Sequence, residues 1–600
     1  MPRMARPGCA SRAWPFALAV IVGLAATAGA FAADMRKTLH VAFPVAETGF
    51  DPQAIGDTYS DALCLGIFDP LYRYDYFARP VTLQPNTADG LPEITDGGRT
   101  YTIKVKRGIY FAADAAFNGK RRELTAEDYV YSIKRVLDPK VRSYWLYLFE
   151  QTLVGLDGPL ERARKSGRFD YDEKIEGLQA IDRYTLRVRF TQPDFGFKWW
   201  LTTSSVAAVA REVVEKYQDD SHRVMENPVG TGAYRLKSWT RGQRIVLEAN
   251  PDFRDETYPS PGRDPADAAI AKGLTGRKLP LAGIVDIAII EEAQPRLLSF
   301  DRGQLDYVSV PPSLAPTVLD GEKLRPELAR RGVVLHRLPE PSLGFFFFNL
   351  DDPVVGGYEP AKIALRRAIS LAYDREGAIR QLAKGQALVA DQPVPPGLYG
   401  HDPSVAVKVP YDPAAARALL DRFGYRDRNG DGYRETPDGK PLTLQKGSTT
   451  EAEARASDEL WKRNMDAIGI RIAFVKNKWP ELNKMTEAGQ MMMWGLGWIS
   501  GIPDGDPFYS YLVTRNIGTS NDARLRLPEY DRLYDQAHSL PDGPARNAIY
   551  RKLNALIANY APWIVADYPY RNDLTQPWLK GFKPNAFQRW QWAYYDAEAH

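Results

Sequence analysis

The sequence predicts a mixed α/β protein with at least two domains, and three observations lead to this fold class. Segments such as 101–106 and 186–190 alternate apolar and polar residues with period two, which is typical of strands with one solvent-facing side. Segments with helical periodicity and recognisable ends lie between these strands. The chain of 600 residues is also longer than a single hydrophobic core normally supports.

The expected helices have clear start and stop signals. Thr125 and Asp128 form a capping-box-like start, and Pro139 follows the end of that helix. Asp412 is expected as the N-cap of a second helix, and Gly424 fits the C′ position after it. A looser strand is expected at 471–475, and further helices at 360–372 and 460–468.

The first 32 residues have the three-part pattern of a secretory signal peptide. Arg3, Arg6 and Arg12 form a basic region, residues 14–28 are uncharged and mostly apolar, and residues 30–32 form a small-x-small cleavage signal. The alternative is a membrane anchor, but the apolar run is shorter than the roughly 20 residues that span a bilayer. We therefore expect residues 1–32 to be a signal peptide that is removed on export.

The charge balance and the cysteine content limit which partners the protein is expected to bind and whether it can form a disulfide. The whole chain has 78 Lys and Arg against 75 Asp and Glu, and the expected cleavage removes three arginines, which leaves 75 of each sign. A formally neutral mature chain gives no indication of binding to nucleic acid or to an anionic membrane. Cys64 is then the one cysteine left, so an internal disulfide is excluded, and its apolar neighbours predict a buried thiol.

The sequence lacks the motifs that usually accompany catalysis. Its six histidines are scattered singly, and none has the i, i+4 spacing that places two imidazoles on one helix face for zinc. There is no G-x-S-x-G elbow and no P-loop in the chain. We therefore expect a protein that is not an enzyme and that carries no cofactor.

One loop resembles the calcium-binding pattern D-x-[DN]-x-[DN]-G. Its candidate ligands are Asp427, Asn429, Asp431 and Asp438, with Gly432 at the sharp turn. The closing residue is Asp438 instead of the longer Glu, and a strand instead of a helix is expected after it. Asn-Gly and Asp-Gly pairs also form turns without a metal. A structural turn is the preferred interpretation, and a calcium site is the alternative.

The segment 491–508 combines methionine, tryptophan, glycine, aspartate and proline at high density. Its three methionines suit a core strand, but the residues after them are unsuited to a strand interior. Aromatic walls with a few well-placed polar groups are typical of small-molecule pockets. We expect a loop shaped around a ligand here, and a rigid structural turn is the alternative.

Short segments in a fixed order across nearly the whole mature chain follow a known family pattern. Thr125-Ala-Glu-Asp128 is similar to the pattern tAeDV, and Pro228-Val-Gly-Thr-Gly-Ala-Tyr234 is similar to PvGTGpY. Further matches lie at 50–52, 67–71, 83–101, 105–111, 247–251, 303–306, 348–349, 365–375 and 411–420. Together these segments resemble the bacterial family 5 extracellular solute-binding proteins, relatives of the dipeptide and oligopeptide receptors of ABC importers.

The resemblance implies a two-lobed α/β fold of the periplasmic binding protein type (type II-like, cluster C), with the ligand cleft between the lobes. Lobe I would comprise residues 33–290, with an inserted subdomain at about 72–180. Lobe II would comprise residues 291–567, and residues 568–600 would return to lobe I.

The resemblance also implies a periplasmic, monomeric receptor that binds a peptide or peptide-like solute and delivers it to an inner-membrane ABC permease. Closure of two lobes around a ligand links binding to a shape that the permease recognises. The missing catalytic motifs agree with this role. The alternatives are a metal-chelate, haem or nickel receptor of the same family, a secreted hydrolase and a periplasmic chaperone.

The departures from the family pattern concern the ligand. Peptide receptors of the family commonly have an aspartate three residues after the motif tryptophan, and counting from Trp498 this position is Gly501. The oligopeptide type has an arginine three residues before the tryptophan, where this chain has Gly495. Asp504 and Asp506 are near enough in sequence to substitute for the aspartate. The ligand-binding candidates are Trp498, Ser500, Gly501, Asp504 and Asp506, together with Asp57 and Tyr59 from the segment after residues 50–52.

Overall fold

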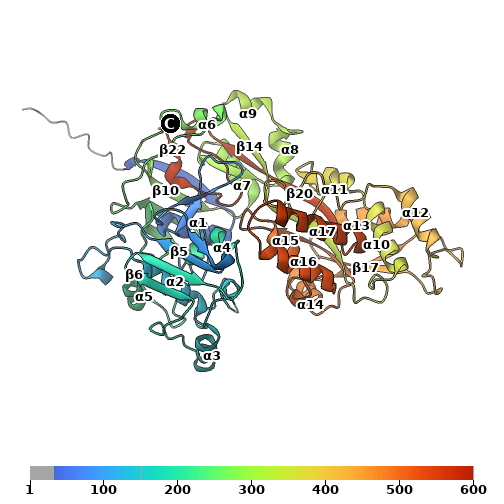
Figure 1. Ribbon diagram of the computed structural model, residues 1–600. Helices are drawn as coiled ribbons and strands as arrows, with labels where there is room; N and C mark the ends of the chain where they lie inside the picture. The colour runs from blue at the N-terminus through green and yellow to red at the C-terminus, as the bar shows by residue number, and fades with distance from the viewer. Residues whose placement is uncertain (1–32, 151, 599–600) are drawn as a thin grey trace, which may run out of the picture.

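The computed structural model describes residues 33–150 and 152–598, which form two lobes side by side (Figure 1). The predicted signal peptide lies outside the described residues. Within the described part of the chain, no helix combines the length and the apolar character that crossing a membrane requires. The predicted α/β class with two lobes is confirmed by three larger sheets and the helices packed on them.

Lobe I is built on a four-stranded sheet with the order β1-β10-β9-β8. β1 and β10 are parallel, and the other neighbours are antiparallel. The alternate residues Leu39, Val41 and Phe43 are buried in the core of this lobe, as expected for a strand with one covered face. The strands are β1 (Asp34–Phe43), β8 (Tyr234–Thr240), β9 (Arg244–Ala249) and β10 (Ala282–Ile289).

A second four-stranded sheet, with a hydrophobic core of its own that extends from Leu71 to Val229, is inserted into lobe I. Two of its strands, β5 and β7, were predicted from the sequence, and α2 begins at the predicted capping box of Thr125 and Asp128. The elements are β4 (Glu93–Thr95), β5 (Thr100–Lys104), α2 (Ala126–Leu137), β6 (Leu178–Asp182) and β7 (Thr185–Arg189).

Lobe II contains the largest sheet, in the order β11-β20-β15-β19-β17-β18, and β14 and β16 also pair with β20. The predicted strand at 471–475 is β18, an edge strand parallel to β17. The strands are β11 (Tyr307–Val310), β14 (Val334–Pro339), β15 (Ser342–Phe348), β16 (Ala387–Val389), β17 (Thr443–Ser448), β18 (Arg471–Lys476), β19 (Met493–Ile499) and β20 (Trp563–Thr575).

The long strand β20 connects the two lobes (Figure 1). Its first half pairs with β15 in lobe II, and its second half pairs with β14 and β11. Asp306, next to β11, accepts a hydrogen bond of 2.7 Å from the backbone N–H of His40 in lobe I. Beyond β20, the C-terminal residues 579–597 pack into the core of lobe I. The lobe and subdomain bounds given above stay predictions.

Several helices of lobe II begin and end close to the residues predicted from the sequence. The helix expected at 360–372 is α10, and Asp412 caps α12 by accepting from the N–H of Ala415. Gly424 has the positive φ of 86° expected at C′. The helix expected at 460–468 is the second half of α13. The helices are α10 (Pro360–Ala372), α11 (Arg375–Gln381), α12 (Pro413–Arg422), α13 (Ala452–Asp466), α14 (Trp479–Glu487), α15 (Asp506–Ser510), α16 (Pro528–His538) and α17 (Pro544–Tyr560).

The two lobes also touch through side chains. Lys198 of lobe I forms an ion pair of 2.8 Å with Asp542 of lobe II. Ile502, in the loop after β19, is buried against Tyr74 and Trp199 of lobe I. The loop predicted to surround a ligand therefore lies where the lobes meet.

Candidate functional site

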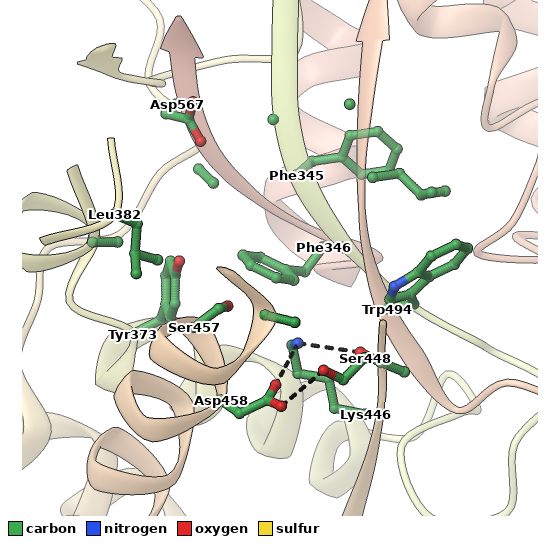
Figure 2. Close-up of a pocket in the computed structure, with 18 of the residues that line it drawn as sticks. Phe345, Phe346, Tyr373, Leu382, Lys446, Ser448, Ser457, Asp458, Trp494 and Asp567 are labelled. Atoms are coloured by element: carbon green, nitrogen blue, oxygen red, sulfur yellow. Dashed lines mark hydrogen bonds and ion pairs between the residues drawn. The ribbon is translucent and has the colours of Figure 1, made fainter. Parts of the chain in front are cut away.

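A pocket of about 420 Å³ lies in lobe II (Figure 2). Its floor is formed by β15, β17, β19 and β20, and residues of α11, α13 and α14 line its sides. β19 continues directly from this pocket into the loop that touches lobe I. The pocket is therefore connected through one strand to the contact between the lobes.

Glycines on one face of the sheet make room for the pocket. A Cβ atom on Gly495 would lie 2.6 Å from the ring of Phe346, and one on Gly344 would lie 2.6 Å from the carboxylate of Asp567. These two side chains therefore occupy the space above glycines on neighbouring strands. Above Gly497 no atom lies closer than 3.9 Å to the position of a Cβ, so the floor is open there.

The middle of the pocket is aromatic. Phe346 contacts Tyr373 and Trp461 with ring centroids 5.1 and 4.8 Å apart, and Tyr373 stacks on Trp461 at 4.5 Å. Leu382 and Trp494 complete these walls (Figure 2). An apolar, aromatic middle is typical of sites for organic solutes.

One end of the pocket carries a net positive cluster. The Nζ of Lys446 lies 3.7 Å from one oxygen of Asp458, and the Nζ of Lys476 lies 2.5 Å from the other. Ser448 donates to the same carboxylate at 2.8 Å. Burial lowers the pKa of Lys446 to about 8, against the opposing effect of Asp458. Two amines face one carboxylate here, so this end attracts an acceptor or an anion.

Asp567 lies at the other end of the pocket (Figure 2). Among the described residues, no hydrogen bond or ion pair reaches its carboxylate. Burial raises the pKa of Asp567 to about 6, and no cation opposes this effect. The pocket thus has an uncompensated carboxylate at one end and an amine cluster at the other.

None of the five residues predicted from the 491–508 segment lines this pocket, although Trp498 directly follows the lining residue Gly497 on β19. Trp498, at the end of β19, stacks on Tyr511 with ring centroids 4.5 Å apart. Ser500 is buried, and its hydroxyl donates to the carbonyl of Ile502 at 2.7 Å, which stabilises the turn. Gly501 is exposed, and nothing lies within 4 Å of the position of its Cβ.

The two predicted carboxylates of the loop are bound to protein groups. Arg546 donates to Asp504 at 2.8 Å and to Asp506 at 3.4 Å, and Tyr534 donates to Asp506 at 2.8 Å. Burial acts to raise the pKa of Asp506, but His538 and Arg546 lower it to about 2. Burial raises the pKa of Asp504 despite Arg546. Both carboxylates therefore hold the loop against α16 and α17.

Asp57 and Tyr59 lie at the start of α1 (Thr58–Ile67) in lobe I. Asp57 is the N-cap of this helix and accepts from the N–H groups of Tyr59 and Ser60. The ring of Tyr59 packs against Phe43 and Trp590, with centroids 5.0 and 5.3 Å away. Asp57 thus has a capping role, and Tyr59 is part of an aromatic cluster.

The calcium-like loop is stabilised by contacts within the protein. Asp427 accepts from the N–H groups of Gly430 and Gly432 at 2.7 and 2.9 Å. Asp431 pairs with Arg471, and Asp438 pairs with Lys440. Among the described residues, no group of three or more His, Cys, Asp or Glu side chains could hold a metal ion. This geometry corresponds to the structural turn.

The charged residues of the pocket, Lys446, Asp458 and Asp567, were not predicted from the sequence. A signal was present for two of them, because Lys446 is the one charged residue of β17 and Asp567 directly follows the apolar residues 563–566 of β20. The position of Asp567 in the pocket depends on the pairing of β15 with β20, which brings Gly344 opposite Asp567.

Comparisons with known proteins agree with this architecture. Residues 82–520 match the family model described as "Bacterial extracellular solute-binding proteins, family 5 Middle". Heme-binding protein A of Haemophilus influenzae is 23% identical over 82% of this chain and 81% of its own length. Di/tripeptide-binding protein 2 of Pseudomonas aeruginosa is 24% identical over 93% and 95%, respectively.

Among solved structures, HbpA2 of Haemophilus parasuis superposes with a TM-score of 0.73 and 18% identity, covering 94% of this chain and 100% of the other. The predicted two-lobed periplasmic binding protein fold is thereby confirmed. The family model extends from the inserted subdomain through β19 and its loop, so it includes most of the pocket. The chain belongs to family 5 of the bacterial extracellular solute-binding proteins.

Proposed function

We propose that this protein is the periplasmic receptor of an ABC importer, and that it binds a peptide or peptide-like organic solute between its lobes and delivers it to the inner-membrane permease. The observation that carries the proposal is the pocket with an aromatic middle and opposite charges at its two ends. A peptide has the same distribution of charge, with an ammonium, an apolar body and a carboxylate. The di/tripeptide-binding relative supports this ligand class.

The two-lobed architecture supports a clamp. The contacts of Lys198 with Asp542 and of Ile502 with lobe I join the lobes through side chains, so the relative position of the lobes can depend on the ligand. A ligand that binds the closed form better shifts the population toward it. Closure would bring lobe I further over the loop after β19, where the lobes already touch, and would present one shape to the permease.

The proposal is tested by native mass spectrometry of freshly purified protein, followed by scattering and thermal unfolding with the ligand that is found. We expect a bound organic solute, a smaller radius of gyration and a higher Tm with ligand. Stabilisation should reach about 2.7 kcal/mol at a ligand concentration of 100 times Kd. Identical scattering with and without a tightly bound ligand would exclude the clamp.

Haem is the second candidate ligand, because a relative is a heme-binding protein and the pocket has aromatic walls. An absorption spectrum of the purified protein distinguishes the two ligands. A Soret band that persists through gel filtration would favour haem, and a colourless protein that closes on peptides would favour the peptide proposal.

We also propose that residues 1–32 are removed during export and that the mature protein is a periplasmic monomer. N-terminal sequencing of the protein released by osmotic shock should begin within a few residues of Ala33. Membrane-bound protein that retains Met1 would contradict this.

A further inference from the structure

We propose that Asp567 is the specificity residue of the pocket, which binds a positively charged group of the solute, so that ammonium-bearing solutes are selected over their neutral analogues. This inference rests on the proposed function and extends it to the chemical class of the ligand. It concerns a residue outside the 491–508 loop.

Asp567 differs from several other described carboxylates of the fold in having no cation beside it. Asp51 accepts two hydrogen bonds from Arg135, and Asp69 is paired with Arg254. Asp504 is paired with Arg546. Burying an ionised carboxylate without a cation costs free energy, so folded proteins usually place a cation beside a buried carboxylate. Asp567 has none among the described residues, and it lines a pocket from which a ligand can supply the cation.

The position of Asp567 in the sheet also suits contact with a solute. Gly344 lies directly opposite Asp567 in the sheet, and the carboxylate occupies the space where a side chain at 344 would be. Beside it, the open floor at Gly497 leaves room for a ligand atom. The carboxylate is therefore placed over the floor of the pocket and faces the space that a solute would fill (Figure 2).

The opposite end of the pocket has the complementary charge to Asp567. Lys446 and Lys476 share one carboxylate, so that end suits the acceptor or anionic end of a solute. A solute with a cation at Asp567 and an acceptor at Lys446 would satisfy both ends, with its apolar body against Phe346 and Tyr373. Of the carboxylates considered from the sequence, Asp504 and Asp506 are paired with Arg546, and Asp57 caps α1. Of the two carboxylates that line the described pocket, Asp458 is paired with lysines, and Asp567 remains for the ligand.

The neighbouring pocket residues Arg375 and Tyr373 do not account for a change in ligand affinity between pH 5 and 7. Arg375, at the start of α11, donates to the backbone carbonyls of Val565 and Ser370 and to the Ser370 hydroxyl, not to Asp567. Burial lowers its pKa to about 10, and burial raises the pKa of Tyr373, so neither group titrates between pH 5 and 7. A change in affinity in this pH range is therefore assigned to Asp567.

The test is calorimetry with di-, tri- and tetra-alanine and their N-acetylated forms. The variants are Asp567→Asn and the matched control Asp522→Asn. Asp522 is a second carboxylate of lobe II whose pKa is raised by burial, to about 7, but it does not line the pocket. We expect the wild type to bind the free-amine peptides at least tenfold more tightly than the acetylated forms. Asp567→Asn should abolish this preference, and Asp522→Asn should retain it.

The affinity of the wild type for the free-amine peptide should also fall as the pH is lowered through about 6, because protonation removes the charge of Asp567. Asp567→Asn should be insensitive in this range. Equal binding of acetylated and free-amine peptides by the wild type would overturn the inference, as would a preference that survives in Asp567→Asn. A co-purified solute without a cationic group would overturn it too, although solute binding would stand. Failure to bind or close on any solute would instead contradict the proposed function.

Discussion

At the scale of single residues, the charges of lobe II differ in how they are compensated. Arg546 is 2% exposed and is surrounded by the carboxylates of Asp504, Asp506 and Asp542. Asp567 is partly buried and has no such partner among the described residues. Binding sites often carry groups that are unfavourable in the empty protein, because the ligand compensates them. The same reasoning gives two predictions for substitutions in the pocket.

The first prediction is that Asp567→Asn stabilises the ligand-free protein at pH 7 to 8. Because the pKa is raised from 3.8 to about 6, the folded state binds the proton more tightly than the unfolded state, so the ionised carboxylate costs stability above about pH 6. A shift of about two units corresponds to at most about 3 kcal/mol. Urea unfolding should show the largest gain near neutral pH, and the gain should vanish as the pH falls through 6 toward 4. A gain that is independent of pH would contradict the assignment.

The second prediction separates two glycines of the same strand. Gly497→Leu should fill the open floor and weaken ligand binding at least tenfold, while the free energy of unfolding changes by less than about 1 kcal/mol. Gly495→Leu should clash with the ring of Phe346 and destabilise the protein by about 1 to 3 kcal/mol. Calorimetry and denaturant unfolding of both variants measure the two effects. Unchanged affinity in a folded Gly497→Leu protein would exclude this floor as part of the site.

At the scale of elements, the loop after β19 is attached to lobe II by α16 and α17. Tyr534 of α16 and Arg546 of α17 both donate to Asp506. Tyr399 and Tyr550 place their rings over the Arg546 guanidinium at 5.3 and 5.2 Å. The loop that touches lobe I is therefore held by a buried ionic network, and its position does not require a ligand.

The third prediction compares two arginines of α17. Arg546→Met should destabilise the protein by about 3 to 5 kcal/mol, because it leaves buried carboxylates without their cation. Arg551→Met, on the same helix, removes a pair with Asp402 in which the arginine side chain is 49% exposed, and it should change stability by less than about 1 kcal/mol. Thermal and denaturant unfolding measure both. Equal effects would show that the network around Asp504 contributes little.

At the scale of the whole molecule, β20 joins the lobes covalently, and side-chain contacts also cross between them. Lys198 and Asp542 form an ion pair across the lobes, and Arg589 pairs with Glu340 at 2.7 Å. Ile502 adds an apolar contact. A partly exposed ion pair contributes at most about 1 kcal/mol, so these contacts bias the open and closed forms without locking either.

The fourth prediction is that Lys198→Ala shifts the ligand-free protein toward the open form. Its radius of gyration should increase, and ligand affinity should fall by up to about fivefold, because closure loses one favourable contact. Lys165→Ala is the control, since Lys165 pairs with Glu161 within its own helix and should leave both quantities unchanged. A Lys198→Ala protein with the wild-type scattering profile would show that this pair does not influence closure.

Local patterns in the sequence were sufficient for much of the secondary structure. The strands β5, β7 and β18 and the starts of α2, α10 and α12 follow from period-two alternation, capping residues and proline positions. These signals act between residues a few positions apart, so they are visible along the chain. The buried Cys64 was predicted in the same way from its apolar neighbours. The family followed from the order of short motifs.

The charges of the site were decided by tertiary structure. The order of residues along the chain was sufficient to predict the α/β class and the family, and it contains a pattern typical of a signal peptide and lacks the common catalytic motifs. It did not show that Arg546 pairs with Asp504, or that Asp567 lies over Gly344, more than 200 positions earlier. Strand crossovers and helix packing decide which residues lie beside each other. The free energy of a buried charge depends on whether its neighbour carries the opposite charge. Whether a carboxylate stabilises the fold or remains for a ligand is therefore decided by the tertiary structure.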